Sequence, residues 1–348
     1  MTDGEGGGGG ASAFKRAQLR YRRQSTSSND LNDVCDFGKP KEDERIYQIT
    51  ITNSSGELYD GPLYAIHGFS GFLYAPQALA PCWQKELSYL AVSEYCEKPH
   101  ATNIDNLPPN PTEENNTDES MWELWKREND DGEHHKSTKG KKKYRSFKKL
   151  SWATKGYHYD WTSRRYHEGA KSEMPESLSQ LAIRFAKTSL HLENAASMTY
   201  TASASIVNYY TVKSIMGGHR DDLELALDKP VISLSLGMAA IFLLGGKTKD
   251  DTPIVPILVR SGDVMILGGD CRLNYHGMAR TIPVTFNLPV VPRLTTSLTF
   301  RGTSVVPASD EEPLAAFLRT HRININVRQV LPDGVESMIP DHSQASLS

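Results

Sequence analysis

Residues 230–269 read PVISLSLGMAAIFLLGGKTKDDTPIVPILVRSGDVMILGG and contain four short apolar runs. Glycine, proline or polar residues separate each run from the next, which is the punctuation expected between successive β-strands. Many short strands without alternating helical patterns are typical of a sandwich or jelly roll and not of a βαβ array. The stretch therefore predicts a mainly β core.

Segments outside this stretch add further strands and a few helices. Apolar residues at helical spacing predict helices within 81–96 and 175–187. Ser309 and Glu312 have the spacing of a capping box, which predicts the start of a short late helix. The segments with a strand pattern are 71–76, 203–213 and 321–330. We therefore expect a mainly β fold with flanking helices and an N-terminal α/β extension.

Changes in composition along the chain divide it into four parts. The first is too poor in apolar residues to offset the entropy of ordering, except for a short basic helix within 14–24. A polar, charge-segregated linker ends the second part. The four parts are a flexible segment at 1–45, an extension with helices and a basic linker at 46–149, a jelly-roll domain at 150–335, and a tail at 336–348.

The bulk composition excludes several classes of protein. A net charge of −3 over 348 residues gives no global preference for nucleic acid or membrane. No run approaches the roughly 20 apolar residues of a membrane span. Four scattered cysteines argue against a disulfide scaffold and against a structural zinc site, and favour a reducing compartment.

The first residues lack the basic start and apolar run of a signal peptide. We therefore expect an intracellular protein of the nucleus, the cytoplasm or both. The basic run at 14–24 is also compatible with mitochondrial targeting. The oligomeric state stays open.

Two histidines and an aspartate form a candidate metal site. His219 and Asp221 stand two residues apart in GGHRDD, so in a strand both side chains would share one face. His276 follows the apolar run that ends at residue 269. Two imidazoles and a carboxylate make the facial triad of non-haem Fe(II), which leaves positions for a co-substrate and O₂. Taken singly, these residues also fit ordinary surface polarity or a hydrogen-bonded core histidine.

The run HRININVRQV at 321–330 offers a candidate anion site. Arg322 and Arg328 share one strand face with two asparagines, and Ile and Val side chains share the other. Arginines on an inward face are costly unless anions meet them, whereas a solvated arginine face is the alternative. A dicarboxylate such as 2-oxoglutarate would be held by an arginine fork. Asn208 and Tyr210 lie on one face of an earlier strand as neutral donors to the same molecule, or as ordinary cross-strand polarity.

Taken together, these motifs resemble the AlkB-type Fe(II)/2-oxoglutarate dioxygenases in order, spacing and strand context. The match to the AlkB homologue 1 branch extends over nearly the whole chain, and is weaker in the 100–140 linker and after residue 332. The matching stretches are FKRAQLRYRRQS, GFLYAP, LSWATKGYHYDW, NYY at 208–210, HRD at 219–221, PVISLSLGMAAIFLLGG, SGDVMILGGDCRLNYHGM and the R-x5-R of the last strand.

The resemblance implies a double-stranded β-helix core and a set of ligands. It assigns Fe(II) to His219, Asp221 and His276. It assigns 2-oxoglutarate to Asn208, Tyr210, Arg322 and Arg328, with Arg322 at the distal carboxylate and Arg328 near the iron-proximal one. Family members use O₂ to hydroxylate an N-methyl or similar carbon, and the product then releases formaldehyde.

Two features depart from the bacterial member of the family. That enzyme carries an acid two residues after the iron aspartate, where this chain has Leu223 beside Asp222, so base selectivity stays open. The interval from His276 to Arg322 is also long, and could cover one rim of the site.

The aromatic stretch SWATKGYHYDW is a candidate for base contact. Enzymes that act on a base extrude it and hold it between flat side chains, although at least half of these rings are expected to be core. The resemblance favours Trp152 and Tyr157, and Tyr159, Asp222 and Arg272 are further candidate substrate contacts. A lysine-rich run upstream is a solvated linker, a localisation signal or a phosphate track; it contains Lys139, Lys141, Lys142, Lys143, Arg145, Lys148 and Lys149.

The sequence thus predicts a dioxygenase that removes or oxidises methyl groups on nucleic-acid bases. tRNA is slightly preferred over DNA, because ready-made single-stranded loops lower the cost of unstacking. The alternatives are a dioxygenase that hydroxylates a protein or small molecule, and a jelly-roll binding module without metal. The lyase activity attributed to this branch needs a lysine nucleophile, and no single lysine can be assigned to it.

Overall fold

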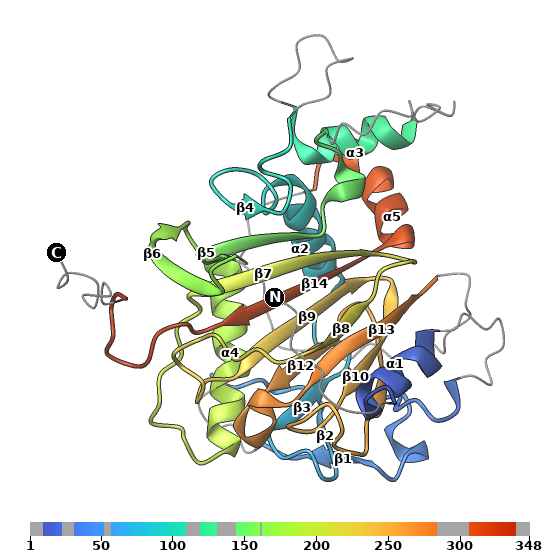
Figure 1. Ribbon diagram of the computed structural model, residues 1–348, viewed down its shortest axis with the longest axis vertical. Helices are drawn as coiled ribbons and strands as arrows, with labels where there is room; N and C mark the ends of the chain where they lie inside the picture. The colour runs from blue at the N-terminus through green and yellow to red at the C-terminus, as the bar shows by residue number, and fades with distance from the viewer. Residues whose placement is uncertain are drawn as a thin grey trace.

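Two antiparallel β-sheets face each other in the computed structural model, which describes residues 10–22, 31–51, 57–108, 119–130, 144–160, 162–283 and 306–338 (Figure 1). In order across the large sheet, the strands are β1 (Ile46–Ile49), β2 (Leu63–Ile66), β3 (Phe72–Ala75), β12 (Val264–Leu267), β9 (Val231–Gly237), β14 (His321–Arg328), β7 (Ala204–Thr211), β5 (Trp152–Asp160) and β4 (Ala101–Thr102), with β6 (Arg165–Lys171) paired to β5. The small sheet contains β11 (Val255–Val259), β10 (Ala239–Leu244), β13 (His276–Ile282) and β8 (Met216–His219).

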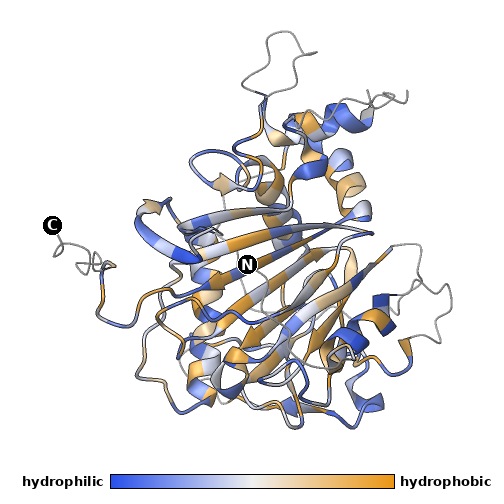
Figure 2. Cartoon of the chain, viewed as in Figure 1, coloured by the Kyte–Doolittle hydropathy of each residue, from blue (hydrophilic) through white to orange (hydrophobic). Residues whose placement is uncertain are grey.

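Three helices cover one face of the large sheet, and residue alternation along the strands explains why. In β14, Ile323 and Ile325 join the main hydrophobic cluster together with residues of these helices. Arg322 and Asn324 point to the other face and line a pocket. The helices are α2 (Pro81–Ser93), α4 (Glu176–Leu192) and α5 (Glu311–Thr320). Figure 2 shows the hydrophobic segments along the central strands and more hydrophilic residues in β6.

The predicted fold class is confirmed: the chain is mainly β with flanking helices. The predicted helices within 81–96 and 175–187 correspond to α2 and α4. The predicted capping box at Ser309 is wrong. Ser309 lies in a 3-10 turn (Ala308–Asp310), and α5 begins at Glu311 without a hydrogen bond from a capping side chain. Asp310 instead accepts hydrogen bonds from Tyr89 and Lys126, the second of which belongs to α3 (Met121–Asp130).

The four-part division of the chain differs from the structure at its N-terminal end. The helix α1 (Ala13–Arg22) packs on β8, β10 and β13, and Cys35 and Phe37 are buried in a cluster with residues of both sheets. Strands β1 to β3 extend the large sheet because β3 pairs with β12. Within the described part of the chain, residues expected to be flexible or separate are therefore integral to the core. All four cysteines are free thiols, and Cys82 is the exposed one.

The helix α1 holds the strand that carries the first candidate metal ligand. Phe14 is 2% exposed, and a Cβ at Gly218 would lie only 2.6 Å from its ring, so the glycine permits this close approach. Gln18 donates a hydrogen bond to the carbonyl of Met216 at 2.9 Å. The second glycine of GGHRDD, Gly218, therefore has a packing role in addition to any role in a turn.

Replacing Phe14 with alanine is expected to destabilise the protein by about 3–5 kcal/mol, because it empties a buried aromatic site. The measurement is the free energy of unfolding in denaturant. Leu19→Ala on the exposed side of the same helix is the control, since Leu19 is 45% exposed and such changes stay within about 0.5 kcal/mol. Equal stability of both variants would show that α1 does not belong to the core.

Candidate functional site

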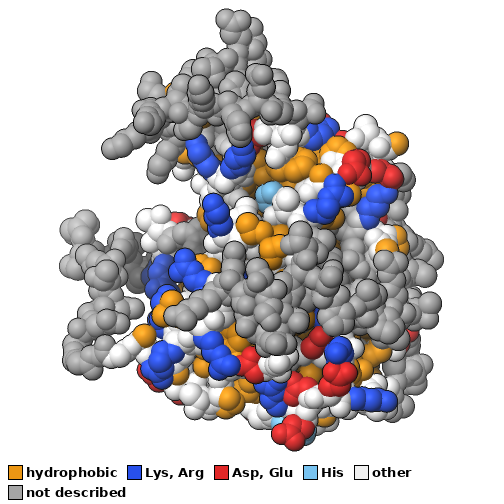
Figure 3. Space-filling model, turned by 90° about the vertical axis from the view of Figure 1, so that its right-hand side faces the viewer, with side chains coloured by type: hydrophobic (Ala, Val, Ile, Leu, Met, Phe, Trp, Pro, Cys, Tyr) orange, Lys and Arg blue, Asp and Glu red, His pale blue; other side chains and the backbone are white. Residues whose placement is uncertain are grey.

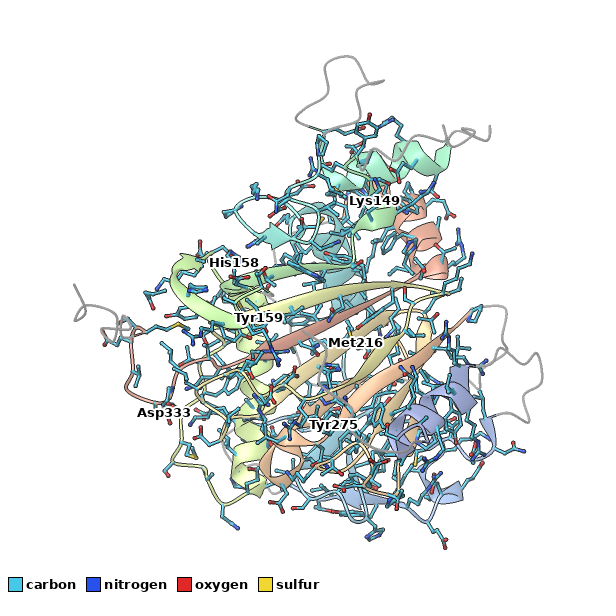
Figure 4. The ribbon with its side chains drawn as sticks, viewed as in Figure 1. Lys149, His158, Tyr159, Met216, Tyr275 and Asp333 are labelled. Carbon is cyan, nitrogen blue, oxygen red and sulfur yellow. The ribbon has the colours of Figure 1, made fainter. Side chains whose placement is uncertain are left out.

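A pocket lies between the two sheets, and both contribute to its wall. Its polar lining contains the three predicted metal ligands and three of the four predicted co-substrate residues, Asn208, Tyr210 and Arg322. Met216, which also lines the pocket, lies near the centre of the molecule in Figure 4. The lining residues are Asn208, Tyr210, Met216, His219, Asp221, Val231, Ser233, Ala240, Phe242, Met265, Leu267, His276, Gly277, Met278, Arg322, Asn324 and Asn326. Every strand that the sequence marked with a candidate ligand therefore borders one cavity.

The three predicted metal ligands converge in this pocket. His219 ends β8 and His276 begins β13, and the two residues are direct cross-strand partners with ring centroids 4.5 Å apart. Potential ligand atoms of His219, Asp221 and His276 all lie within 4.8 Å of one another. Sequence positions more than fifty residues apart are thus joined by strand pairing.

One detail of that expectation is wrong, because Asp221 does not lie in the strand. β8 ends at His219, and Asp221 follows in an irregular segment. The backbone carbonyl of Asp221 accepts a hydrogen bond from Arg272 Nη1, and not from the backbone of a neighbouring strand among the described residues. A buried guanidinium therefore places the carboxylate beside the histidines.

Both histidines are oriented by backbone carbonyls. Nδ1 of His219 lies 2.9 Å from the Gly217 oxygen, and Nδ1 of His276 lies 3.0 Å from the Asn274 oxygen. Because a carbonyl oxygen can only accept, each Nδ1 carries a proton, so the neutral form of each imidazole has its lone pair on Nε2. The Nε2 atom of His276 lies 3.7 Å from Asp221 Oδ2. This donor set fits a divalent transition metal with open positions.

Charges around the cluster keep these groups in metal-binding form. Burial alone would raise the pKa of the Asp221 carboxyl, but Arg328, followed by both histidines and Arg272, holds that pKa well below its usual range. Burial and the neighbouring His219 lower the pKa of His276 to about 4. An ionised carboxylate beside a neutral imidazole is the state in which both groups bind metal.

Arg322, the residue predicted to bind an anion, lines the pocket. Its side chain is buried and donates to the Ser235 hydroxyl at 2.9 Å and to the Met238 carbonyl at 3.4 Å. Its Nε has no hydrogen-bond partner, and no carboxylate of the described residues lies within 4.0 Å of the guanidinium. A buried cation paired only with neutral groups is costly. The pocket therefore fits an anion at Arg322.

Cross-strand registers place the other predicted co-substrate residues next to Arg322. Tyr210 of β7 is the direct partner of Arg322, and Asn208 is the partner of Asn324. Burial raises the pKa of Tyr210 to about 12, so its hydroxyl keeps the proton and can donate. Asn324 donates to Ser233 and to a backbone carbonyl. These side chains form one polar strip across the large sheet.

Arg328 has a different setting from Arg322. It is absent from the pocket lining, and its Nη1 lies 3.2 Å from Asp221 Oδ1 and 2.9 Å from Glu224 Oε1. Glu224 also accepts hydrogen bonds from Arg272 and Tyr166. Reasoning from the sequence missed Glu224 and Tyr166. The balance of buried charges could have indicated Glu224, because two arginines near one aspartate require a second carboxylate.

The structure does not bring the five candidate substrate residues into the pocket lining. Tyr157 and Tyr159 are buried in a separate cluster with Tyr166, and Tyr157 donates to Glu168. Figure 4 places Tyr159 near the β5–β6 hairpin. Trp152 is half-buried in β5. Asp222 is also half-buried and forms an ion pair with Arg220. The guanidinium of Arg272 is buried and donates hydrogen bonds to Lys229, Asp221 and Glu224.

The lysine-rich run lies largely outside the described residues, including Lys139, Lys141, Lys142 and Lys143. Lys148 and Lys149, which end the run, are exposed in a 3-10 turn (Phe147–Lys149). Figure 3 shows further Lys and Arg side chains down the left side of the face displayed there. No described helix is long and apolar enough to cross a membrane.

Comparisons with known proteins agree with this geometry. Residues 109–328 match the 2OG-Fe(II) oxygenase superfamily. The chain is 30% identical to "Nucleic acid dioxygenase ALKBH1" of Homo sapiens over 92% of this chain and 85% of that protein. It is 29% identical to "DNA N(6)-methyladenine demethylase ALKBH1A" of Arabidopsis thaliana over 91% and 96%. It is 30% identical to "tRNA demethylase abh1" of Schizosaccharomyces pombe over 53% and 54%.

Proposed function

The chain belongs to the 2OG-Fe(II) oxygenase superfamily, and we propose that it oxidatively demethylates or oxidises methylated bases in nucleic acid. The observation that carries the proposal is the buried Arg322, which lacks a carboxylate partner among the described residues and shares a pocket with His219, Asp221 and His276. A metal centre and a separate anion site in one cavity match a co-substrate that chelates metal at one end and carries a carboxylate at the other.

Different residues of the pocket would bind the metal and the co-substrate. His219, Asp221 and His276 would hold Fe(II), and Arg322 would hold the distal carboxylate of 2-oxoglutarate. When bound, the metal with 2-oxoglutarate and O₂ supplies the oxidation of a carbon–hydrogen bond. The chain itself orients the imidazoles through backbone carbonyls and keeps Asp221 ionised through Arg328.

Other residues would complete the co-substrate site and exclude water. Asn208 and Tyr210 would donate to 2-oxoglutarate, and Arg328, which lies outside the pocket lining, would act near its iron-proximal end through its contact with Asp221. Apolar residues in the pocket wall, Phe242 and Met278 among them, keep water from the reacting centre.

Nucleic acid as substrate is supported by the activities for which the relatives are named. One is a nucleic acid dioxygenase, one acts on DNA methyladenine and one acts on tRNA. We prefer tRNA slightly over DNA, because a base in a loop costs less to unstack than one in a duplex. Trp152 and Asp222, which are half-buried, remain the candidate substrate contacts with exposed surface. Four free thiols support an intracellular site of action.

The test is formaldehyde release from methylated tRNA, methylated single-stranded DNA and unmethylated controls, with 2-oxoglutarate consumption measured in parallel. We expect formaldehyde from at least one methylated nucleic acid and none from the controls. Consumption of 2-oxoglutarate that rises with a peptide or small molecule, but with no methylated nucleic acid, would favour the alternative substrate class.

Charge reversal of Lys141, Lys142 and Lys143 to glutamate is expected to weaken binding to methylated tRNA, because lysines that neutralise phosphates release counterions on binding. The logarithmic dependence of affinity on salt should become shallower by about 0.7–0.9 for each phosphate that the variant no longer neutralises. Turnover of a free methylated nucleoside serves as the control and should not change. Unchanged tRNA affinity and salt dependence would exclude the phosphate-track role.

A further inference from the structure

We propose that Glu224 is a positioning residue for the candidate metal site, acting on Asp221 through Arg328 and Arg272. The inference rests on the proposed function, because it takes Asp221 as a metal ligand. Glu224 does not line the pocket and is not in the group of described residues that could hold a metal ion. Its side chain is 1% exposed, so it acts through the residues that it contacts.

Every oxygen of the Glu224 carboxylate is engaged. Oε1 lies 2.9 Å from Arg328 Nη1 and accepts a hydrogen bond from the Tyr166 hydroxyl at 2.8 Å. Oε2 lies 2.9 Å from Arg272 Nη2. Both arginines therefore share this one carboxylate, which fixes the separation of their guanidinium groups.

The same two arginines hold Asp221 at two points. Arg328 Nη1 lies 3.2 Å from Asp221 Oδ1, and Arg272 Nη1 donates to the Asp221 backbone carbonyl. The other carboxylate oxygen, Oδ2, is left toward His276. Asp221 lies outside any strand, so these two contacts position it in place of the hydrogen bonds of a sheet. Glu224 sets where both donors lie.

Charge balance gives Glu224 a second effect on the same ligand. Two buried guanidinium groups face two buried carboxylates, Asp221 and Glu224. If Glu224 were neutral, Asp221 would be the one carboxylate left to neutralise both arginines. A carboxylate that neutralises two arginines is a weaker metal donor. Tyr166 extends the assembly to β6, which ties the β5–β6 hairpin to the metal ligand.

The test measures Co(II) affinity of the full chain by the visible absorption of the bound ion, without 2-oxoglutarate. Glu224→Gln keeps the shape of the side chain and removes its charge. We expect its dissociation constant for Co(II) to rise by about 10- to 100-fold, as for other partners that orient metal ligands. Tyr166→Phe removes one hydrogen bond to Glu224 and is expected to give a smaller rise of about three- to tenfold.

Asp36→Asn is the matched control. Asp36 forms a two-point ion pair with Arg260 at 2.6 and 2.7 Å, and neither residue lines the pocket. Asp36→Asn and Glu224→Gln should both lower the thermal midpoint of the metal-free protein, because the first leaves the buried Arg260 and the second leaves the buried Arg272 without its carboxylate. Only Glu224→Gln should change Co(II) affinity.

The outcomes separate this inference from the proposed function. Loss of Co(II) binding in Asp221→Ala, with wild-type affinity in Glu224→Gln, would overturn the positioning role and leave the function standing. Wild-type Co(II) affinity in Asp221→Ala would contradict the metal site itself. If Glu224→Gln does not fold, Tyr166→Phe decides: weakened binding supports the role, and unchanged binding overturns it.

Discussion

Asp221→Ala is expected to reduce 2-oxoglutarate-dependent turnover to background. The substitution removes the only carboxylate among the three groups that could hold a metal, so the loss should exceed the roughly 10- to 100-fold cost of removing an outer-shell partner. It also leaves Arg328 and Arg272 with one carboxylate instead of two, which destabilises the buried cluster. Formaldehyde release and bound iron, measured on the same preparation, report the two effects together.

Asp228→Asn is the control for this prediction. Asp228 lies seven residues farther along the same segment, and its side chain is 52% exposed beside Lys229. Turnover and iron content should both stay at the wild-type level. Full turnover in Asp221→Ala, with iron retained, would remove Asp221 from the metal site.

Arg322→Met is expected to raise the dissociation constant for 2-oxoglutarate by about a hundredfold to a few thousandfold, because loss of one partner of a buried charge pair costs about 3–5 kcal/mol. The metal-free variant without 2-oxoglutarate should be as stable as the wild type or more stable, since methionine replaces a buried cation that lacks a carboxylate partner among the described residues. Thermal unfolding with and without 2-oxoglutarate measures both effects.

Arg319→Met separates this effect from a general loss of positive charge. Arg319 is on the exposed side of α5, pairs with Glu312 and is 53% exposed. Its replacement should leave the stabilisation by 2-oxoglutarate unchanged. A wild-type thermal shift with 2-oxoglutarate in Arg322→Met would mean that the co-substrate carboxylate binds elsewhere.

Alternation along single strands made much of this site predictable. The pattern of HRININVRQV placed Arg322 and Asn324 on the pocket face and the isoleucines in the core, as the structure has them. Strand pairing then joined His219 to His276, which spacing alone could not show. The resemblance had assigned both histidines to one iron site without giving the pairing of their strands.

Residues outside regular periodicity were not predictable in the same way. Glu224 and Asp221 lie in an irregular segment, where no period marks a buried side, and their placement depends on Arg272 and Arg328 from distant parts of the chain. Tyr157 and Tyr159 carried a base-contact expectation, yet both are buried in a hydrophobic cluster that includes Tyr166. Aromatic residues beside a basic run look alike in sequence whether they face a pocket or a core.

The N-terminal segment shows a third limit. Phe14, Gln18 and Tyr21 are all buried and lie on one side of α1 at helical spacing, but many charged residues surround them. Composition averaged over 1–45 hides so narrow an apolar stripe. The packing of Phe14 against Gly218 became visible only with the fold.

The most direct test of the central claim is an anaerobic titration of the Fe(II)-loaded protein with 2-oxoglutarate, followed by its metal-to-ligand charge-transfer absorption. We expect a band that needs both Fe(II) and 2-oxoglutarate, saturates at one of each per chain, and is absent in His219→Ala. A wild-type protein that forms no such band, or a His219→Ala variant that forms it at full intensity, would contradict the assignment of this pocket.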